Sequence, residues 1–200
     1  MRFPSPRVLF LTLLAGLLAV GATAPSSAPA QDSSAPETAA SDVEARWQTM
    51  SDRFDGVWRL AVPVAQARRT VEGAVDRAVN AMNFFLRGVA RPMIRDNTPV
   101  NEEIELRFRT QQSLYVRFDH RANYTSELAR TRTVQTPDGD PMRLTQRFRD
   151  NNLEQVFQAD NGTRWNVFTI LPDGRMRMSA TTQGEMMPQP LRFSLTYRRR

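Results

Sequence analysis

The run MRLTQRFRDNNLEQVFQADNGTRWNVFTILPDGRMRM, residues 142–178, decides the fold. Apolar and polar residues alternate along it, and turn signals interrupt the alternation every 11 or 12 residues, both within the run and beside it. These signals are Asp138-Gly139, Asp150-Asn151-Asn152, Asn161-Gly162, Asp173-Gly174 and Gly184. Alternation indicates strands with one buried face, and Asp-Gly or Asn-Gly between strands indicates tight hairpins. The run therefore predicts an antiparallel β-meander, bent into a barrel or a sandwich.

The same alternation extends from Glu102 to the C-terminus. Nearly every segment has one apolar face and one face that carries arginine, which is typical of antiparallel sheets packed on one side and wet on the other. With a short strand around Trp58, the sequence predicts eight or nine strands. We expect a mainly β fold: an antiparallel up-and-down, lipocalin-like barrel, with apolar side chains inside and a long amphipathic helix inserted after the first strand.

An outer-membrane barrel would invert this arrangement and turn the apolar faces toward lipid. Its strands need about 9 to 11 residues, and the segments here are shorter. The chain also ends on Arg198-Arg199-Arg200 instead of an aromatic residue, and a helical segment at residues 63–91 fits such a barrel poorly. We favour the water-soluble barrel and keep the membrane barrel as the alternative.

Residues 1–30 have the three parts of a secretory signal peptide. The parts are the basic residues Arg2 and Arg7, the apolar run Val8–Val20 and the small-residue pattern Ala28-Pro29-Ala30, with Ala22-Thr23-Ala24 as a second possible cleavage site. Pro25-Ser26-Ser27 interrupts the run before it reaches the roughly 20 apolar residues of a spanning helix. We predict export to the periplasm or the extracellular space, with no membrane span after cleavage. Residues 31–40 predict a disordered leader and residues 41–200 a single barrel domain.

The composition excludes several classes of function. The chain has no cysteine, which rules out disulfides, thiolate metal sites and cysteine catalysis. All 27 basic residues are arginine, and the 21 acidic residues are scattered among them. Without Arg2 and Arg7, 25 basic residues stand against 21 acidic ones, a net charge of +4. This mixed surface does not indicate nucleic-acid binding.

Two segments have helical periodicity. Ser41 and Glu44 fit a capping box, which predicts a helix from about Asp42 to Arg53. From Pro63 to Arg91, apolar residues recur every three or four positions, which predicts one long amphipathic helix that Arg91-Pro92 ends. Its apolar line consists of Val64, Ala67, Val71, Ala74, Ala78, Met82, Phe85 and Val89.

Gly56-Val57-Trp58 lies on the first predicted strand, directly after a short helix. A Gly-x-Trp in that place, followed by an antiparallel meander with a basic end, resembles the lipocalin and fatty-acid-binding superfamily. The resemblance implies that Trp58 packs across one end of the barrel and that an arginine of the last strand, matched here to Arg198, stacks over it. It also implies that the inserted helical segment corresponds to a lid over the cavity.

Catalytic and metal-binding patterns are weak. His120 is the only histidine, and Asp119-His120 with Tyr124 nearby could form an acid–base site, but a loop histidine explains it better. One histidine without cysteine cannot supply a zinc site, and Asp138-Gly139-Asp140 is better explained as a turn than as part of a calcium loop. We predict no metal, no cofactor and no enzymatic activity.

The inward aromatic residues remain as candidates for ligand contact. They are Phe108, Phe118, Phe148 and Trp165. A barrel of this size is either packed solid or holds one small ligand. We therefore expect an exported binding module for a small apolar or lipidic ligand, and keep as the alternative a structural or interaction protein of the cell envelope with a filled barrel.

Overall fold

A computed structural model of the chain describes residues 36–109, 112–119 and 121–200, with side chains from Val43 onward. The predicted signal peptide, the first half of the predicted leader and His120 lie outside these residues. Helix α1 begins at Pro36 and so takes in the last residues that we assigned to the leader. Among the described residues, no helix combines the length and the apolar character that crossing a membrane requires.

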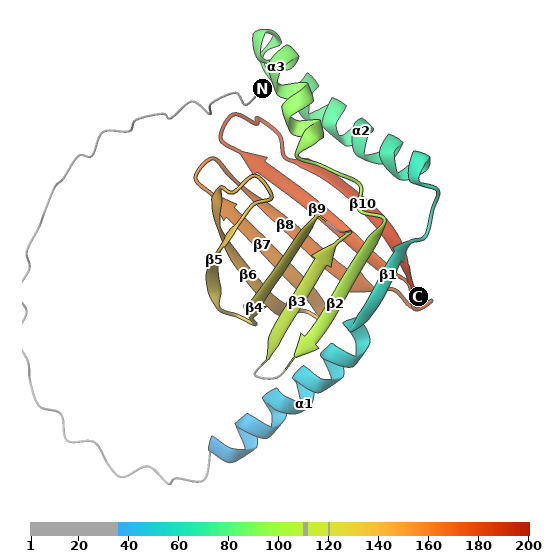
Figure 1. The fold of residues 1–200 in the computed structure, drawn as a ribbon, viewed down its shortest axis with the longest axis vertical. Helices are drawn as coiled ribbons and strands as arrows, with labels where there is room; N and C mark the ends of the chain where they lie inside the picture. Colours follow the sequence, from blue (N-terminus) through green and yellow to red (C-terminus); the bar gives the residue numbers. More distant parts are fainter. Residues whose placement is uncertain (1–35, 110–111, 120) are drawn as a thin grey trace, which may run out of the picture. The chain divides into compact units, whose positions relative to one another are not determined.

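The described residues form ten antiparallel strands in one sheet, slightly more than the eight or nine predicted (Figure 1). Each strand pairs with the next along the chain except β4 with β5, and β1 pairs with both β2 and β10. The strands are β1 (Gly56–Leu60), β2 (Glu103–Arg109), β3 (Ser113–Phe118), β4 (Ala122–Glu127), β5 (Thr131–Gln135), β6 (Pro141–Arg149), β7 (Asn152–Ala159), β8 (Gly162–Ile170), β9 (Met176–Gly184) and β10 (Leu191–Arg199). The predicted fold class, an up-and-down barrel, is confirmed.

The barrel is nearly closed, because β4 and β5 are the two edge strands of the sheet. No ladder joins them, and the contacts across the gap run from β4 and the residues after it to β5 and β6. Leu128 forms a parallel bridge with Gln146, and the Ser126 hydroxyl lies 2.8 Å from Oε1 of Gln146. The segment 124–135, which the sequence left open as one strand or two, holds the end of β4 and all of β5.

The hairpins form where the sequence predicted them. Between β6 and β7, Asp150 and Asn151 both have positive φ, 47° and 61°. Two adjacent left-handed residues are what a two-residue type I′ hairpin requires, and asparagine and aspartate tolerate that conformation better than most residues. The turn before β9 also requires a left-handed residue, and Gly174 supplies it with φ of 78°.

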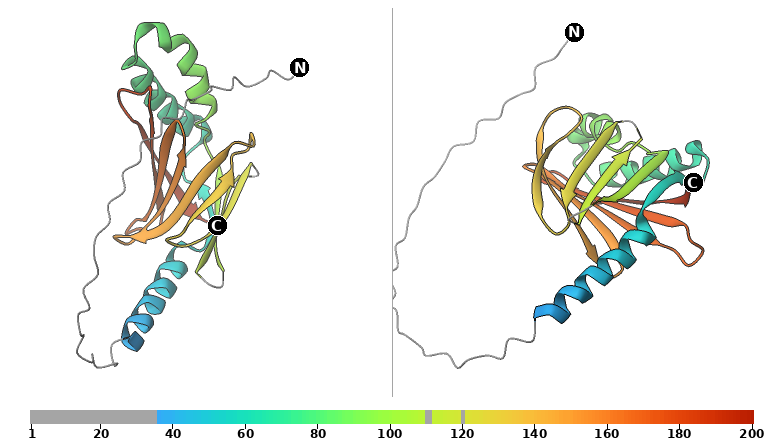
Figure 2. Two further views of the ribbon diagram at one scale, coloured as in Figure 1. Left: turned by 90° about the vertical axis from the view of Figure 1, so that its left-hand side faces the viewer. Right: turned by 60° about the horizontal axis from the view of Figure 1, so that its bottom comes forward.

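Three helices cover the two ends of the barrel (Figures 1 and 2). Helix α1 (Pro36–Phe54) lies at the end that holds the β2–β3 and β4–β5 turns, called the α1 end below. Helices α2 (Val64–Asn80) and α3 (Phe84–Asp96) lie toward the opposite end, called the α3 end. Helix α2 buries its apolar face against the barrel through Ala67, Val71, Ala74, Val75, Ala78 and Val79.

The long helix predicted from Pro63 to Arg91 is two helices. The first ends at Asn80, and Asn83 caps the second by accepting the backbone N–H of Phe85 at 3.2 Å. This break rotates the second helix, so Phe85 and Val89 leave the buried line and are 85% and 72% exposed. The predicted stop at Pro92 is also wrong, because backbone hydrogen bonds such as Asn97 N to Met93 O continue the helix beyond it.

Trp58 is buried where the first and last strands meet. Its indole N–H donates to the carbonyl oxygen of Phe54 at 2.9 Å, so it also fixes the end of α1. Gly56 precedes it with φ of 140°, a conformation that side chains rarely adopt. A Cβ atom at Gly56 would lie 3.5 Å from Nε of Arg199, which crosses over this position. The Gly-x-Trp pattern thus has a local physical basis.

The arginine over Trp58 is Arg199, and the assignment to Arg198 is wrong by one residue. The guanidinium carbon of Arg199 lies 4.8 Å from the centre of the indole ring. Strand pairing gives the reason: Trp58 is opposite Arg199, whereas Arg198 is opposite Arg59 and so points to the outer face. Arg199 also donates to the carbonyl oxygens of Asp52 and Arg53, which ties α1 to β10.

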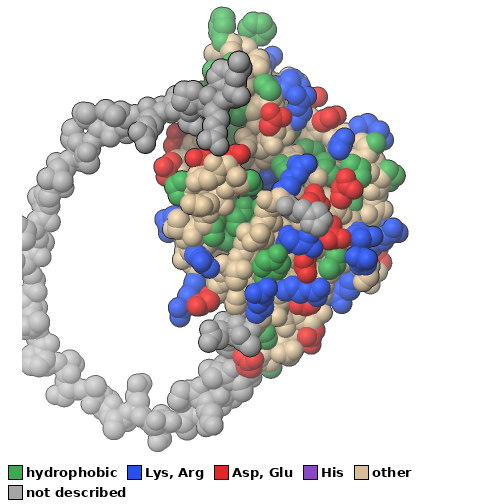
Figure 3. All heavy atoms as spheres, in the orientation of Figure 1, with side chains coloured by type: hydrophobic (Ala, Val, Ile, Leu, Met, Phe, Trp, Pro, Cys, Tyr) green, Lys and Arg blue, Asp and Glu red, His purple; other side chains and the backbone are tan. Residues whose placement is uncertain are grey.

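Arginines and glutamates alternate on the outer face of β1, β2 and β3, where Figure 3 shows mixed positive and negative side chains. Arg117 pairs with Glu103 and Glu105, and Arg107 pairs with Glu105 and Asp55. The hydrogen bond from Arg117 holds the pKa of Glu105 below its ordinary value, and Arg107 adds to that effect. The arginine-bearing face of the strands is therefore neutralised locally.

We expect replacement of Arg199 by alanine to lower the unfolding free energy by about 1 kcal/mol, because it removes a cation–π contact of that order at an exposed site. Arg198→Ala removes the neighbouring arginine, which does not stack on Trp58, and should lower the unfolding free energy by less than half as much. Urea unfolding followed by tryptophan fluorescence measures both. Equal losses for the two variants would contradict the stacking role of Arg199.

Candidate functional site

Strand register arranges the interior of the barrel in successive layers across β6 to β10. One layer on the side of the α1 end is wholly apolar and consists of Phe148, Leu153, Phe168, Met178 and Leu195. Most of its side chains are fully buried. The next two layers toward the α3 end differ from it, because each contains polar side chains that face inward.

The middle layer, called the polar layer, contains Gln146, Gln155 and Asn166 on three adjacent strands. They are only 0%, 0% and 2% exposed. Asn166 donates to Oε1 of Gln155 at 3.0 Å, and Ser126 of β4 bonds to Oε1 of Gln146 at 2.8 Å. Both glutamine oxygens therefore have partners inside the barrel.

The donor groups of the polar layer are not fully used. Among the described residues, the side-chain nitrogens of Gln146 and Gln155 have no hydrogen-bond partner, and neither has the hydroxyl of Thr182 in the next layer. Leaving a buried donor without a partner costs about 1–3 kcal/mol. Native proteins keep few such groups, and each calls for an explanation. A bound acceptor group is one explanation that fits these donors, which lie on β6, β7 and β9.

Arg164 lies in the third layer, between Phe157 and Thr182. Its Nε donates to Oδ1 of Asn166 at 3.1 Å, and Nη1 donates to the backbone oxygen of Asn97 at the end of α3, at 3.4 Å. Within the described part of the chain, no carboxylate forms an ion pair with it. A charged guanidinium thus faces the interior with two of its five N–H groups in hydrogen bonds.

The surroundings of Arg164 are unfavourable for its charge. Burial lowers the pKa of the guanidinium, and Tyr197 and Tyr124 oppose the shift. Burial also raises the pKa of both tyrosine hydroxyls, so they stay neutral. The side chain nevertheless keeps part of its surface accessible to solvent. The third layer therefore offers a cation and free donors next to an apolar wall.

A second feature is a cavity of about 910 Å³ at the α1 end, between α1 and the β2–β3 and β4–β5 turns. Trp47 and Phe108 lie in its lining, with their rings edge to face at 6.3 Å. Phe108 stacks on Phe148 at 5.6 Å, and Phe148 lies 6.1 Å from Phe54. These four aromatic rings thus connect the lining of the cavity to the apolar layer inside the barrel, to which Phe148 belongs.

The structure separates the four aromatic residues that the sequence proposed as ligand contacts. Phe108 and Phe148 face inward and meet at the α1 end. Phe118 faces inward at the opposite end of β3 and is 8% exposed. Their role in ligand binding stays a prediction. Trp165 does not face inward: it is 37% exposed, because Arg164 and Asn166 on either side of it take the inward positions.

The residues that sequence reasoning missed are the polar ones on inward positions. The signal was present in β6 and β7, where Gln146 stands between Leu144 and Phe148, and Gln155 between Leu153 and Phe157. A polar residue that interrupts an apolar face at period two marks a buried polar group. In β8 the pattern was ambiguous, since Arg164 and Asn166 alternate with apolar Trp165 and Val167, and only pairing with β7 settles the faces.

The sketched acid–base site gains no support from the described residues. The Asp119 carboxylate accepts the backbone N–H groups of Glu102 and Glu103, at 2.8 and 2.7 Å, and so fixes a turn. The Tyr124 ring packs inside the barrel, 5.0 Å from that of Phe157. In the described ranges no three acidic, histidine or cysteine residues gather as metal ligands.

Solved structures share this fold at low sequence identity. The fluorescent protein UnaG matches with a TM-score of 0.50 and 12% identity, over 74% of this chain and 98% of UnaG. Fatty-acid-binding protein 1 of Echinococcus granulosus matches with 0.48 and 11% over 74% and 98%, and lipid binding protein 8 of Caenorhabditis elegans with 0.47 and 10% over 74% and 96%. No protein-family profile and no curated protein matches the sequence. The likeness to UnaG is one of fold alone: an antiparallel, nearly closed up-and-down barrel.

We expect Arg164→Met to raise the unfolding free energy of the ligand-free protein by about 1 kcal/mol, because it removes a buried charge that lacks a carboxylate partner. Arg117→Met should lower it, because Arg117 pairs with two glutamates. Thermal unfolding of both variants measures the difference. A larger loss for Arg164→Met than for Arg117→Met would show that Arg164 is part of the framework.

Proposed function

We propose that this chain is an exported binding protein without catalytic activity, which holds a small amphipathic ligand inside the barrel. The ligand has an apolar body and an acidic or strongly accepting end, and that end lies beside Arg164. A lipidic acid meets this description. Export is supported by the order of basic, apolar and small residues over positions 1–30.

The observation that carries the proposal is the placement of Arg164 together with unused donors. Arg164 lies one layer from the amide nitrogens of Gln146 and Gln155, and it is opposite the Thr182 hydroxyl in the strand register. All four are donors, and the described residues supply no anion for them. Hydrogen bonds between ionised groups are roughly twice as strong as those between neutral ones, so a carboxylate would satisfy this cluster best.

The walls around the third layer fit an apolar body. Leu144 and Phe157 precede Arg164 in the register, and Leu191 follows Thr182. Tyr124 and Phe157 add two rings in edge contact. Pockets for small ligands typically combine such apolar walls with a few placed polar groups.

A filled barrel with a role in the cell envelope is the competing proposal. The α1 half of the interior favours it, since Phe54, Trp58 and Phe168 are at most 1% exposed there. The α3 half does not, because Arg164 and Thr182 face inward and keep accessible surface. The polar layer forms the boundary between the two halves.

Binding of a fluorescent long-chain fatty acid, compared with its methyl ester, tests the proposed function. We expect Arg164→Met to weaken binding of the acid about 10- to 100-fold, because a hydrogen bond to a charged group contributes about 1.5–3 kcal/mol. Binding of the ester should change less than twofold. Titration of probe emission at fixed protein concentration gives both affinities.

Arg147→Met is the matched control, since Arg147 lies on the outer face of β6 and pairs with Glu154 at 2.8 Å. It should leave both affinities unchanged. Absence of saturable binding of both probes to the unmodified chain would favour the filled barrel. Equal weakening of the acid and the ester by Arg164→Met would refute the assigned role of the guanidinium.

A further inference from the structure

Helix α3 exposes most of the large apolar side chains that the described part of the chain turns to solvent. Of seven such side chains, five belong to this one helix. They are Phe84 at 75%, Phe85 at 85%, Leu86 at 38%, Val89 at 72% and Met93 at 59%. Figure 3 shows hydrophobic side chains at the tip of the molecule where α3 lies in Figure 1. Such a concentration on one element marks an interaction surface.

Three stripes of residues run along α3, each with a spacing of four. Leu86, Ala90 and Ile94 form the stripe nearest the protein, in which Leu86 is 38% exposed, Ile94 is half-buried and Ala90 is the only buried residue of the helix. Phe85, Val89 and Met93 form the exposed stripe, called the apolar stripe below. Arg87, Arg91 and Arg95 form the third stripe. Because residues four apart lie on one face, the arginine stripe borders the protein-facing stripe on the side away from the apolar stripe.

Two of the three arginines hold the helix in place. Arg87 donates to the carbonyl oxygens of Asn80 and Met82, at 2.8 and 3.1 Å, and Arg91 pairs with Asp76 of α2. The apolar stripe is therefore presented outward on a braced helix, and not by a loose end. Unlike Arg87 and Arg91, the side chains of the apolar stripe do not hold the helix in place.

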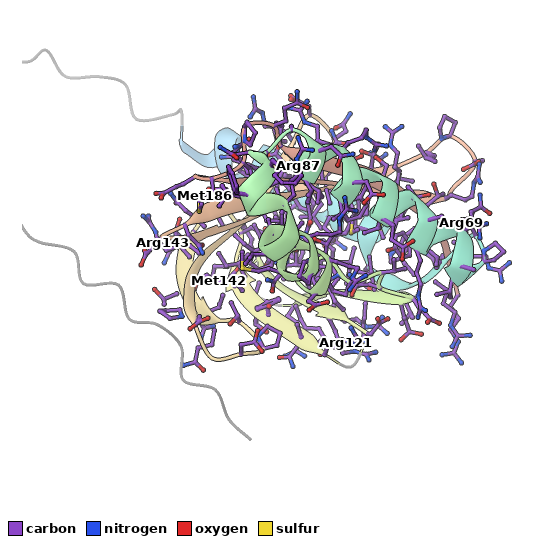
Figure 4. The ribbon with its side chains drawn as sticks, turned by 90° about the horizontal axis from the view of Figure 1, so that it is seen from above. Arg69, Arg87, Arg121, Met142, Arg143 and Met186 are labelled. Carbon is purple, nitrogen blue, oxygen red and sulfur yellow. The ribbon has the colours of Figure 1, made fainter. Side chains whose placement is uncertain are left out.

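The pair of helices that carries the apolar stripe has a net positive charge. From Val64 to Asp96, six arginines stand against three acidic residues. Arg95 is exposed and has no ion pair among the described residues, and Arg68 and Arg69 are exposed on α2. Figure 4 shows Arg69 and Arg87 on the helical pair, and Arg143 away from it on the strands. A helix with an apolar face and arginines on its other side is the pattern of elements that lie on anionic membrane surfaces.

We infer that α3 is an interfacial anchor, which lies in the plane of an anionic phospholipid bilayer with Phe84 and the apolar stripe among the acyl chains. The helix has 13 residues, which is too short to span a bilayer but sufficient to lie in its surface. The net positive charge of α2 and α3 attracts this pair of helices to the lipid phosphates. This inference does not depend on whether the barrel holds a ligand.

A second copy of the chain is the rival occupant, and charge disfavours it. A twofold contact places the same surface of both copies together. Two helices packed through the apolar stripe would therefore bring two net positive surfaces into contact. A bilayer that contains anionic lipid has the opposite charge, and each arginine near it adds about fivefold to binding.

The test reads insertion at α3 itself, with the full chain. Because the chain has no cysteine, Val89→Cys carries an environment-sensitive nitrobenzoxadiazole label at a single known site. Vesicles of phosphatidylglycerol and phosphatidylcholine should raise its emission severalfold and shift it to the blue. The same label on Gln158→Cys, an exposed site on β7, should not respond. A silent label at Val89 under conditions where the chain sediments with the vesicles would overturn the inference.

Charge is tested by Arg69→Gln together with Arg95→Gln, compared with Arg143→Gln on the outer face of β6. The double variant should lower the response of the Val89 label at least tenfold with anionic vesicles, and the control should leave it unchanged. Circular dichroism verifies that the helices remain. A response that grows with protein concentration and not with lipid would show self-association and refute the bilayer as the occupant.

Discussion

The pairing of β1 with β10 is the constraint on which the other features depend. It joins the first strand of the barrel to the last, so that a meander of sequential hairpins becomes a nearly closed wall. Trp58 and Arg199 reinforce this junction from the inner side, and Arg199 extends it to the end of α1. Without this pairing the sheet would have two further exposed edges, and the inward side chains would not enclose a common interior.

Closure gives the inward polar residues their significance. On an open sheet, Gln155 and Arg164 would be ordinary solvated side chains. Inside the barrel, Gln155 is fully buried, and burial disfavours the charge of Arg164. Polar groups that cost stability and are only partly paired are expected where a protein binds something. The apolar layer on one side and the accessible third layer on the other place the proposed ligand site in the α3 half of the interior.

The exposed face of α3 follows from a different physical constraint. The three-residue break at Ala81–Asn83 separates α3 from α2, and Asn83 starts the new helix with a rotated face. In one continuous helix, Phe85 and Val89 would have joined Val71 on the buried side. The break thus turns apolar residues outward, and it places them at the end of the barrel where Arg164 contacts the end of α3.

Much of the fold was predictable, because local patterns suffice for strands and tight turns. The hairpin at Asp150-Asn151 and the short strand at Trp58 needed only their own neighbours. The arginine over Trp58 was misplaced by one residue, since a shift of one position reverses the face of a strand and only the register with β10 fixes it. The prediction that Trp165 faces inward was wrong for the same reason. The polar layer was predictable in part from Gln146 and Gln155. Its unsatisfied donors were not predictable.

The sequence by itself determined the number of strands to within one or two. It also determined the apolar and arginine-bearing faces of most strands and the helical segment after β1. These depend on contacts between residues close in the chain. Only the tertiary structure decided that Arg164 faces the interior, that Arg199 covers Trp58 and that α3 turns its apolar stripe outward. Each of these depends on register between strands or on the rotation of one element against another, and no local pattern encodes either quantity.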